Sequence, residues 1–316
     1  MPVSSSTDRP VAIIGAGAVG TSLTHRLAAC DIDIAGIISS RREPAERLAS
    51  EVAAPVASTS LSDLPGTARV VFLCVPDDVI PSIAAELAEI PHPWPETIVA
   101  HTSGASPSAV LEPLASVGAS VVSFHPMQTF PDRNAPEVFD DIYIGVEGEG
   151  DAVAYAEALV ERLGANPMVL TPAEKTRVHA AAALASNGLA ALVAVVRELL
   201  GTAGLAANDA TRVVQPLIEQ TWSNLKDAPP EIALTGPIVR GDIGTVKEHL
   251  AALEKSAPHL LPVYAVLAKE QVRVARRADR LTDEQSGAIL DIIQAGSTEA
   301  SVPQAPGMTD VSVTET

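Results

Sequence analysis

The feature that most constrains this chain is a glycine-rich run that directly follows a short apolar segment. Val11–Ile14 has the composition of a buried strand, and the run Gly15-Ala-Gly-Ala-Val-Gly20 leads into a stretch rich in alanine and leucine. In such a strand–turn–helix unit the first glycine permits the tight turn, the second lets a pyrophosphate approach the backbone, and the third lets the helix pack closely. Free N–H groups at the helix start favour an anion. We therefore expect a dinucleotide loop at Gly15, Ala16, Gly17, Ala18, Val19 and Gly20.

The first half of the 316-residue chain alternates β-rich and helical segments. Several of the strand candidates are continuous apolar runs, which is typical of parallel strands covered on both faces. This alternation predicts an α/β fold with a doubly wound, parallel, Rossmann-type sheet. The expected strands are Val11–Ile14, Ile34–Ile38, Pro55–Ala57, Val70–Val75, Thr97–Ala100, Ser120–Phe124, Tyr143–Val146 and Pro167–Leu170.

After Thr171 the pattern becomes helical. Thr171, Pro172 and Glu174 form a helix start with a capping box, so a long helix is expected from there past Asn187 toward Leu200. We expect a nucleotide domain over residues 10–171 and an all-α domain over 172–296, between a flexible start (1–9) and a disordered tail (297–316). Further helices are expected at Asp209–Asn224, Ile243–Glu254, Leu260–Arg280 and Asp283–Ile293.

The residues after the second strand distinguish a site for NAD from a site for NADP. An NAD enzyme typically places a carboxylate there to bind the ribose 2′-hydroxyl. Here the run is Ser39, Ser40, Arg41 and Arg42, and arginine binds phosphate through charge-assisted, bidentate hydrogen bonds. This predicts NADP(H). The alternative is that both arginines only begin a solvated helix.

Two more loops should reach the same edge of the sheet, because parallel strands present their carboxyl ends together. We expect these loops to border the nicotinamide end of the cofactor, although each also fits an ordinary strand-to-helix turn. Their residues are Val75, Pro76, Asp77, Thr102, Ser103 and Gly104.

Candidate groups for the chemistry lie on a strand end and on the first helix of the second half. His125, with Met127 beside it, follows the sixth strand, and could bind a substrate carboxylate or carbonyl, or a backbone carbonyl. At 100° per residue, Lys175, His179 and Ser186 share one polar stripe of an apolar helix, which favours a ligand cleft over a buried core histidine.

The roles we assign follow from these side-chain types. Lys175 or His179 is the expected proton donor, and Asn187, beside the stripe, orients the substrate. Ser186 is expected to contact the substrate. Arg240, in a Gly/Pro loop, is expected to clamp a carboxylate, whereas Asp242 is the N-cap of the next helix.

Charge and hydropathy exclude other functions. The net charge is −18, from 21 Lys and Arg against 39 Asp and Glu, which argues against a nucleic-acid partner. The apolar run over 180–196 is broken by Ser186, Asn187 and Gly188, so no membrane span of about 18 residues is expected. The start of the chain is polar and lacks the apolar stretch of a signal peptide. These features predict a cytoplasmic protein.

Cys30 and Cys74 are the only cysteines and should not form a disulfide framework. No metal-ligand spacing is present in the sequence.

These motifs together resemble a known group of proteins. The chain resembles uncharacterised Rossmann-like NADP oxidoreductases whose helical C-terminal domain has no known function and is 6-phosphogluconate-dehydrogenase-like. Their relatives are pyrroline-5-carboxylate reductase, ketopantoate reductase and the β-hydroxyacid dehydrogenases. The runs that carry the resemblance are Gly15–Gly20, Ser39–Arg42, Val75–Asp77, His101–Gly104, Phe124–Phe130, His179–Asn187 and Thr235–Asp242.

The resemblance implies roles for some residues and a homodimer for the chain. Lys175 matches the proton-transferring lysine of β-hydroxyacid dehydrogenases, but His179 stands where they have asparagine. The run at His125 is similar to one in prephenate dehydrogenases, whose catalytic histidine is replaced here near Ser186 and Asn187.

Our main hypothesis is an NADP(H)-dependent oxidoreductase. It would transfer hydride to or from a C=O or C=N carbon of a small, carboxylate-bearing metabolite. The alternatives are a non-catalytic NADP(H) sensor and a prephenate-dehydrogenase-like enzyme.

Overall fold

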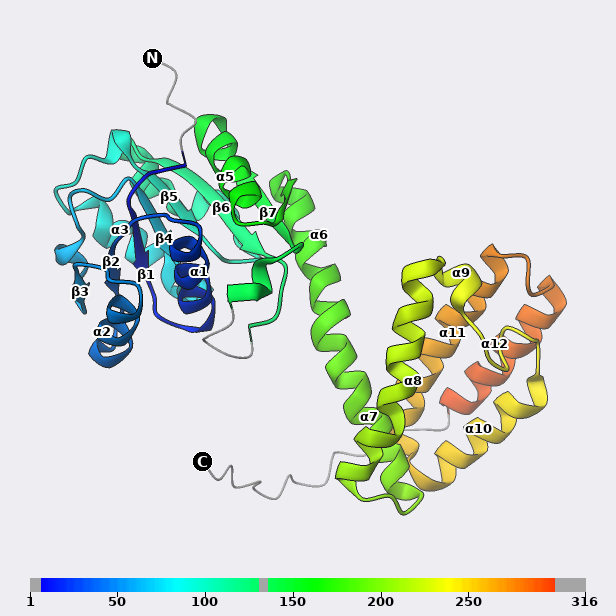
Figure 1. Cartoon of the computed structure of the whole chain (residues 1–316). Coiled ribbons are helices and arrows are strands. Elements are labelled where there is room, and N and C mark those ends of the chain that lie inside the picture. The colour runs from blue at the N-terminus through cyan, green and yellow to red at the C-terminus, as the bar shows by residue number, and fades with distance from the viewer. Residues whose placement is uncertain (1–6, 131–135, 299–316) are drawn as a thin grey trace. The chain divides into compact units, whose positions relative to one another are not determined.

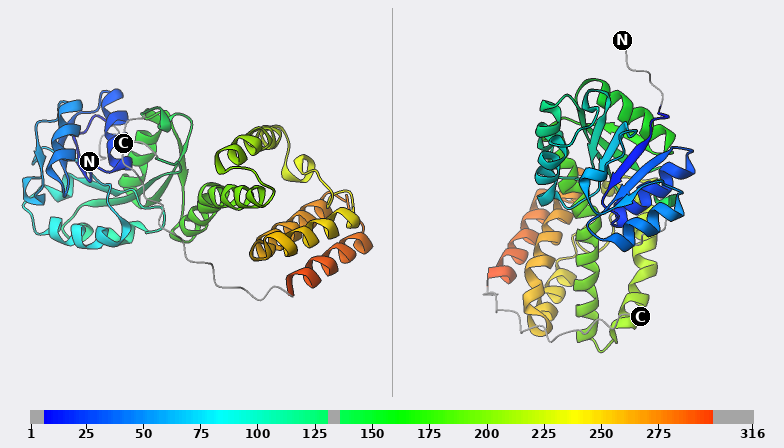
Figure 2. Two further views of the ribbon diagram at one scale, coloured as in Figure 1. Left: turned by 90° about the horizontal axis from the view of Figure 1, so that it is seen from below. Right: turned by 90° about the vertical axis from the view of Figure 1, so that its left-hand side faces the viewer.

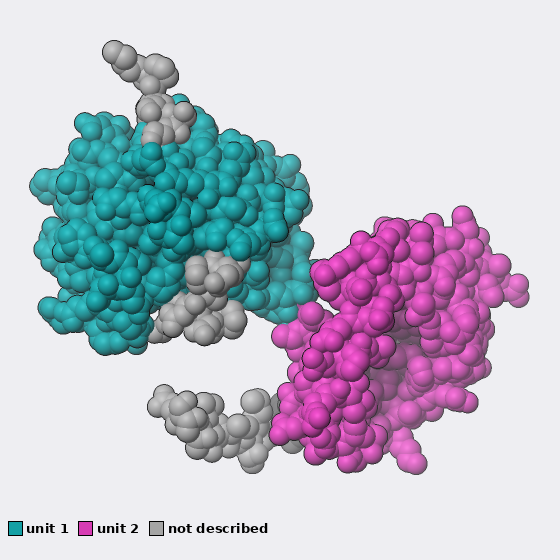
Figure 3. Space-filling view, viewed as in Figure 1, with its two compact units in different colours: residues 1–187 teal, residues 188–316 magenta. Residues whose placement is uncertain are grey.

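The computed structural model describes residues 7–130 and 136–298, which belong to two compact units, 1–187 and 188–316 (Figure 3). The division falls inside the long helix that begins at Pro172, later than the boundary expected near residue 171. The predicted tail lies outside the described residues except for 297 and 298, and residues 1–6 of the predicted flexible start lie outside them as well.

The first unit is built on an eight-stranded sheet in the order β3-β2-β1-β4-β5-β6-β7-β8 (Figure 1). All eight predicted strands are present, with small shifts at their ends, and the predicted α/β fold is confirmed. The strand order reverses between β1 and β4, which is where ligands bind in folds of this class. The strands are β1 (Val11–Ile14), β2 (Ile34–Ile38), β3 (Ala57–Ser58), β4 (Val70–Leu73), β5 (Ile98–His101), β6 (Ser120–Pro126), β7 (Tyr143–Gly148) and β8 (Asn166–Val169).

The last two strands, β7 and β8, depart from the expected parallel arrangement. β7 runs antiparallel to β6, with Phe124 opposite Val146 and His125 opposite Gly145, while β8 is parallel to β7. A parallel pair needs a crossover, usually a helix. The described part of the β6–β7 connection contains only the short 3₁₀ turn Pro136–Phe139, so the chain returns directly along β6.

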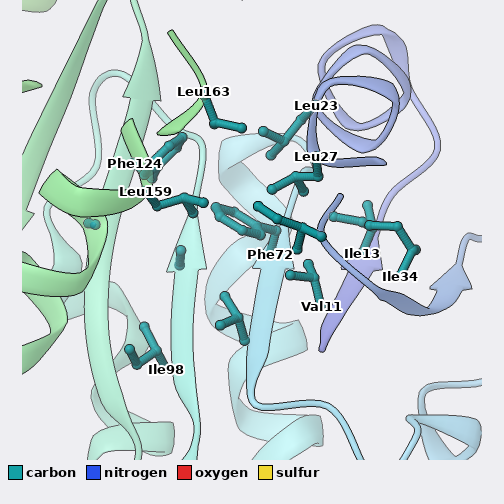
Figure 4. Close-up of a cluster of buried hydrophobic side chains, with 14 of the residues drawn as sticks. Val11, Ile13, Leu23, Leu27, Ile34, Phe72, Ile98, Phe124, Leu159 and Leu163 are labelled. Carbon is teal, nitrogen blue, oxygen red and sulfur yellow. The ribbon is translucent and has the colours of Figure 1, made fainter. Parts of the chain in front are cut away.

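Helices cover both faces of the sheet, and the strand pattern explains why. Val11 and Ile13 pack with Leu23 and Leu27 of the first helix, as Figure 4 shows, whereas alternate residues such as Ile14 belong to the core on the opposite face. One face carries α1 (Ala18–Ala29), α2 (Arg42–Glu51) and α5 (Gly150–Arg162), and the other α3 (Ile80–Ala88) and α4 (Glu112–Ser116).

The described part of the chain beyond β8 contains helices joined by turns and no strand, as expected. The Thr171 capping box is present, and Asp242 accepts the Thr245 N–H as the predicted N-cap. Figure 2 shows α10, α11 and α12 packed together in the second unit. The helices are α6 (Pro172–Ala183), α7 (Leu189–Thr202), α8 (Ala207–Asp227), α9 (Pro230–Ala233), α10 (Ile243–Ser256), α11 (Leu261–Arg277) and α12 (Asp283–Thr298).

The long helix from Pro172 to Thr202 corrects two expectations. A turn of π-helix (Leu184–Gly188) joins α6 to α7, so the helix is not a continuous α-helix. The helix continues past Asn187 to Thr202, as expected. Its 31 residues contain a window of mean hydropathy 1.7, long and apolar enough by length and composition to cross a membrane. One such helix is weak evidence for a membrane protein, but the expectation that no segment would qualify is wrong.

Candidate active site

The glycine loop after β1 has the geometry that phosphate binding requires. Gly15 has φ +109°, and a Cβ there would lie 2.2 Å from the Cys74 carbonyl oxygen. A Cβ on Gly20 would lie 1.9 Å from the Gly15 oxygen, so helix α1 packs too closely for any side chain. At Gly17, by contrast, a Cβ would meet nothing within 4 Å. The first turn of α1 has no acidic residue and no side-chain cap, which leaves its N–H groups free for a ligand.

A cavity of about 740 Å³ opens at the carboxyl ends of β1, β2 and β4. Residues from three separate predicted segments line it together: the glycine loop, the run after β2 and the loop after β4. These residues are Gly15, Ala16, Gly17, Ser39, Ser40, Arg41, Val75 and Pro76. The other predicted cofactor residues, Ala18, Val19, Gly20, Arg42, Asp77, Thr102, Ser103 and Gly104, are not among its lining residues.

The two neighbouring arginines have different surroundings. Arg41 lines the cavity, whereas the Arg42 Nη1 donates to Glu46 Oε1 at 3.2 Å, one turn along α2. Arg42 therefore fits the alternative of an arginine that begins a solvated helix. Thr59 and Ser60 also line the cavity and were not predicted, because β3 is too short to give a clear pattern. The carboxylate of Glu86 lines it as well and opposes an anion.

The loop after β5 is hydrogen-bonded to the loop after β4. Ser103 Oγ donates to Asp77 Oδ2 at 2.7 Å and accepts the N–H groups of Ala105 and Ser106. The Thr102 N–H donates to the Leu73 carbonyl at 3.2 Å. Asp77, Thr102 and Ser103 thus form one connected group at the carboxyl edge.

Lys175 lies beneath this group. Its side chain is 2% exposed, and Nζ donates to the Ser103 carbonyl at 2.7 Å and to Ser123 Oγ at 2.6 Å. Burial lowers the pKa of Lys175 to about 8, and the carboxylates of Glu147 and Asp77 partly oppose that shift. Lys175 is therefore an interior cation held by two oxygens.

Glu147 is a buried carboxylate that the sequence analysis missed. It is 4% exposed and accepts the Ser108 N–H at 2.6 Å and the Ser108 hydroxyl at 2.9 Å. It is the charged residue in the otherwise uncharged strand β7, and that position could have identified it. Its charge compensates the buried Lys175 cation.

Two histidines beside Lys175 are neutral at ordinary pH. Burial, and then the Lys175 charge, lower the pKa values of His101 and His125 to about 4 each. His101 is satisfied at both nitrogens, since Nδ1 accepts the Ser103 N–H and Nε2 lies 3.2 Å from the Pro107 carbonyl. The Nδ1 of His125 lies 3.3 Å from the Thr102 carbonyl, which is the backbone contact that its position allowed.

His125 and His179 meet over Gly104. Their ring centroids are 5.5 Å apart, and the rings are inclined at 72°. A Cβ on Gly104 would lie 2.2 Å from His179 Nδ1 and 2.8 Å from His125 Cε1, so glycine is required for this approach. His179 Nδ1 is buried without a hydrogen-bond partner, a state that native proteins seldom retain without a functional reason.

The remaining predicted residues are less closely gathered. Ser186 and Asn187 lie in the π-helical turn, where the spacing of 100° per residue no longer holds, so the predicted stripe is not continuous. Met127 is half-buried, and its N–H donates to the Tyr143 carbonyl. Arg240 is exposed in the second unit. The substrate roles of these residues stay predictions.

The sequence matches two family descriptions. Residues 4–126 match "Rossmann-like domain" and residues 142–271 match "Domain of unknown function (DUF2520)". No curated protein sequence matches the chain.

Solved structures similar to this chain support the fold. Protein TM1727 from Thermotoga maritima is 26% identical, with a TM-score of 0.68 over 84% of this chain and 98% of that one. Protein BF3122 from Bacteroides fragilis is 24% identical, with a TM-score of 0.65 over 86% and 98%. A reductive aminase from Aspergillus terreus, in complex with NADPH and ethyl levulinate, is 17% identical, with a TM-score of 0.61 over 89% and 98%.

Proposed function

This chain joins a Rossmann-like domain to a DUF2520 domain, and on that premise we propose that it is an NADP(H)-dependent oxidoreductase. The observation that carries the proposal is the cavity at the carboxyl ends of β1, β2 and β4, into which the glycine loop and Arg41 come together. A similarly folded reductive aminase has been solved with NADPH, which supports the choice of cofactor.

The residues present fit this cofactor. The open space at Gly17 and the free N–H groups of α1 suit a pyrophosphate, and Arg41 with the Ser39 and Ser40 hydroxyls suits a 2′-phosphate. The bound nicotinamide would supply or accept the hydride. The protein's part is to hold the substrate carbon in line with it, which can account for much of the rate enhancement.

We propose that the substrate is a small metabolite with a C=O or C=N carbon. His179 is the better-placed proton donor, because Lys175 Nζ is buried and already engaged with two oxygens. Asn187, Ser186, Met127 and Arg240 are proposed to contact the substrate. Free thiols at Cys30 and Cys74 are in keeping with a reducing, cytoplasmic compartment.

The cofactor proposal is tested by a matched pair of glycine variants. Gly17 and Gly66 both have room for a Cβ in the protein alone, but only Gly17 lines the cavity. We expect Gly17→Ala to weaken NADPH binding roughly tenfold or more, a loss of at least about 1.4 kcal/mol, because the methyl group occupies space needed by the pyrophosphate. Isothermal titration calorimetry measures the affinity.

Gly66→Ala is the control and should bind NADPH like the wild type. Equal affinities for all three proteins would contradict a pyrophosphate at this loop. Thermal unfolding of both variants would show whether the fold is retained.

We also propose that the protein is a homodimer. None of the side chains of α7 is buried, and α8 buries only Ala210 and Val214. Leu217 and Trp222 on α8 are 68% and 62% exposed, which is unusual for large apolar side chains without a partner. On α11, by contrast, apolar side chains such as Leu261 and Val272 pack into the core of their own unit. A second copy of the chain is therefore proposed to cover α7 and α8.

A further inference from the structure

We propose that His125 presents a hydrogen-bond acceptor to the substrate, and that Lys175 is a positioning residue that, together with burial of the ring, keeps it in that state. The inference deepens the proposed oxidoreductase function and rests on it. It selects a substrate group that offers an N–H or O–H, such as an iminium, an amine or an alcohol.

The tautomer of His125 follows from its contact with the loop after β5. Its Nδ1 lies 3.3 Å from the Thr102 carbonyl oxygen, and a carbonyl oxygen can only accept a hydrogen bond. Nδ1 must therefore carry the proton. In a neutral imidazole the other nitrogen, Nε2, is then an acceptor. Within the described part of the chain, His125 Nε2 has no hydrogen-bond partner, so it is the nitrogen available to a ligand.

The groups around His125 favour the neutral ring. Lys175 and His179 face it from α6 and disfavour a second positive charge, while Asp77, from the loop after β4, acts in the opposite sense. Burial has the largest effect, and together these influences lower the pKa of His125 to about 4. At neutral pH the ring therefore holds one proton, which Nδ1 donates to the Thr102 carbonyl oxygen.

Lys175 is fixed where it can exert this effect. Its Nζ is held by the Ser103 carbonyl and the Ser123 hydroxyl, and the carboxylates of Glu147 and Asp77 offset the cost of its charge. With 2% of its surface exposed, it does not reach a ligand directly. Its influence on the substrate passes through His125.

An acceptor at His125 changes the expected ligand. A carboxylate or carbonyl oxygen beside Nε2 would place two lone pairs against each other, so the earlier expectation that His125 binds a carboxylate is not the one that this geometry favours. An iminium nitrogen bearing hydrogen, or the amine formed from it, can donate to Nε2.

Side-chain NMR tests the tautomer without any substrate. Long-range ¹H–¹⁵N correlation spectra of the wild type should show His125 protonated at Nδ1 and bare at Nε2 from pH 7.5 down to about pH 5, with His125→Gln used only to assign the signals. In Lys175→Met the pKa of His125 should rise toward the ordinary value of about 6.5, and in Lys175→Arg it should stay low.

A wild-type spectrum with the proton on Nε2 would overturn the proposal, even if Lys175→Met failed to fold. An unchanged His125 titration in a folded Lys175→Met protein would overturn the role of Lys175.

The ligand class is tested with two probes that carry the same isopropyl group. Isopropylamine and isobutyrate are each titrated into the wild type saturated with NADP⁺. We expect the amine, and not the acid, to move the His125 Nε2 resonance, and the reverse result would overturn the substrate class. If NADP⁺ does not bind at all, the proposed function fails, while the tautomer result stands on its own.

Discussion

At the scale of single residues, neighbours in the sequence have separate tasks. Arg41 lines the cavity at the carboxyl ends of β1, β2 and β4, while Arg42 pairs with Glu46 on the exposed side of α2. The sequence identified both arginines as candidates for binding the 2′-phosphate. It could not show which of them lines the cavity, because this depends on the residue at which helix α2 begins. α2 starts at Arg42, which leaves Arg41 as its N-cap at the end of the β2 loop.

This difference predicts the cofactor preference. Arg41→Ala should weaken NADPH binding by roughly 10-fold or more, because a hydrogen bond to a charged group contributes about 1.5–3 kcal/mol. NADH, which lacks the 2′-phosphate, should bind as before. Calorimetric titration of both cofactors measures the ratio.

Arg42→Ala provides the comparison for that measurement. It removes the same charge one residue away and should leave the NADPH-to-NADH preference unchanged. Equal effects of the two substitutions would indicate general attraction by positive charge instead of a specific phosphate contact.

The buried histidines predict an acid-sensitive fold. The pKa values of His101 and His125 are about 4 in the native state, against about 6.5 when unfolded. Between these values the unfolded chain binds more protons, so stability falls as the pH drops from about 6.5 toward 4. Each histidine accounts for up to about 3 kcal/mol at the acid end.

Urea unfolding at pH 7.5 and pH 5, followed by the fluorescence of buried Trp94, measures this loss. The midpoint should be lower at pH 5, and the difference should shrink in His101→Gln. A midpoint that does not change with pH would contradict neutral burial of these rings.

At the scale of helices and strands, most of the first unit could be predicted because its strands are short apolar runs with clear boundaries. The reversed direction of β7 and β8 could not, since the sequence of a strand does not state which neighbour it pairs with. The π-turn at Leu184–Gly188 was also beyond prediction, because its residues fit an ordinary α-helix. For the same reason the predicted stripe joined Ser186 to Lys175 and His179, although only the last two residues lie on α6 proper.

The candidate site was predictable in part. The glycine loop and the residues after β2 have a recognisable spacing and come together in one cavity. The network below them, with Glu147, Ser108 and Ser123, depends on side chains from distant segments that meet only in the folded sheet. In the sequence, the sign of this network was a polar residue, Ser123 or Glu147, within or directly after a predicted strand.

At the scale of the whole molecule, two features have opposite effects on association between copies of the chain: the net charge and the exposed apolar side chains of α7 and α8. A net charge of −18 opposes association of copies, so a dimer must gain its stability from apolar contact. Helices α7 and α8 offer such a surface.

The dimer is tested by placing a charge on that surface. Multi-angle light scattering should give about twice the 32.6 kDa chain mass for the wild type and a lower mass for Leu217→Lys, because burying an unpaired ammonium is costly. Val169→Lys, at an exposed apolar position of the first unit, should remain dimeric. A monomeric wild type would contradict the proposal, and flotation with lipid vesicles would point instead to a membrane partner.

Gly104 has a consequence for how relatives of this protein can diverge. A methyl group at position 104 would collide with the imidazoles of both His125 and His179. Substitution of the glycine is therefore expected to accompany substitution of a histidine. A related sequence with alanine or a larger residue at this position should have lost at least one of the two rings. In an alignment of related sequences, covariation of positions 104, 125 and 179 would therefore separate relatives that keep both imidazoles at this site from those that have changed their chemistry.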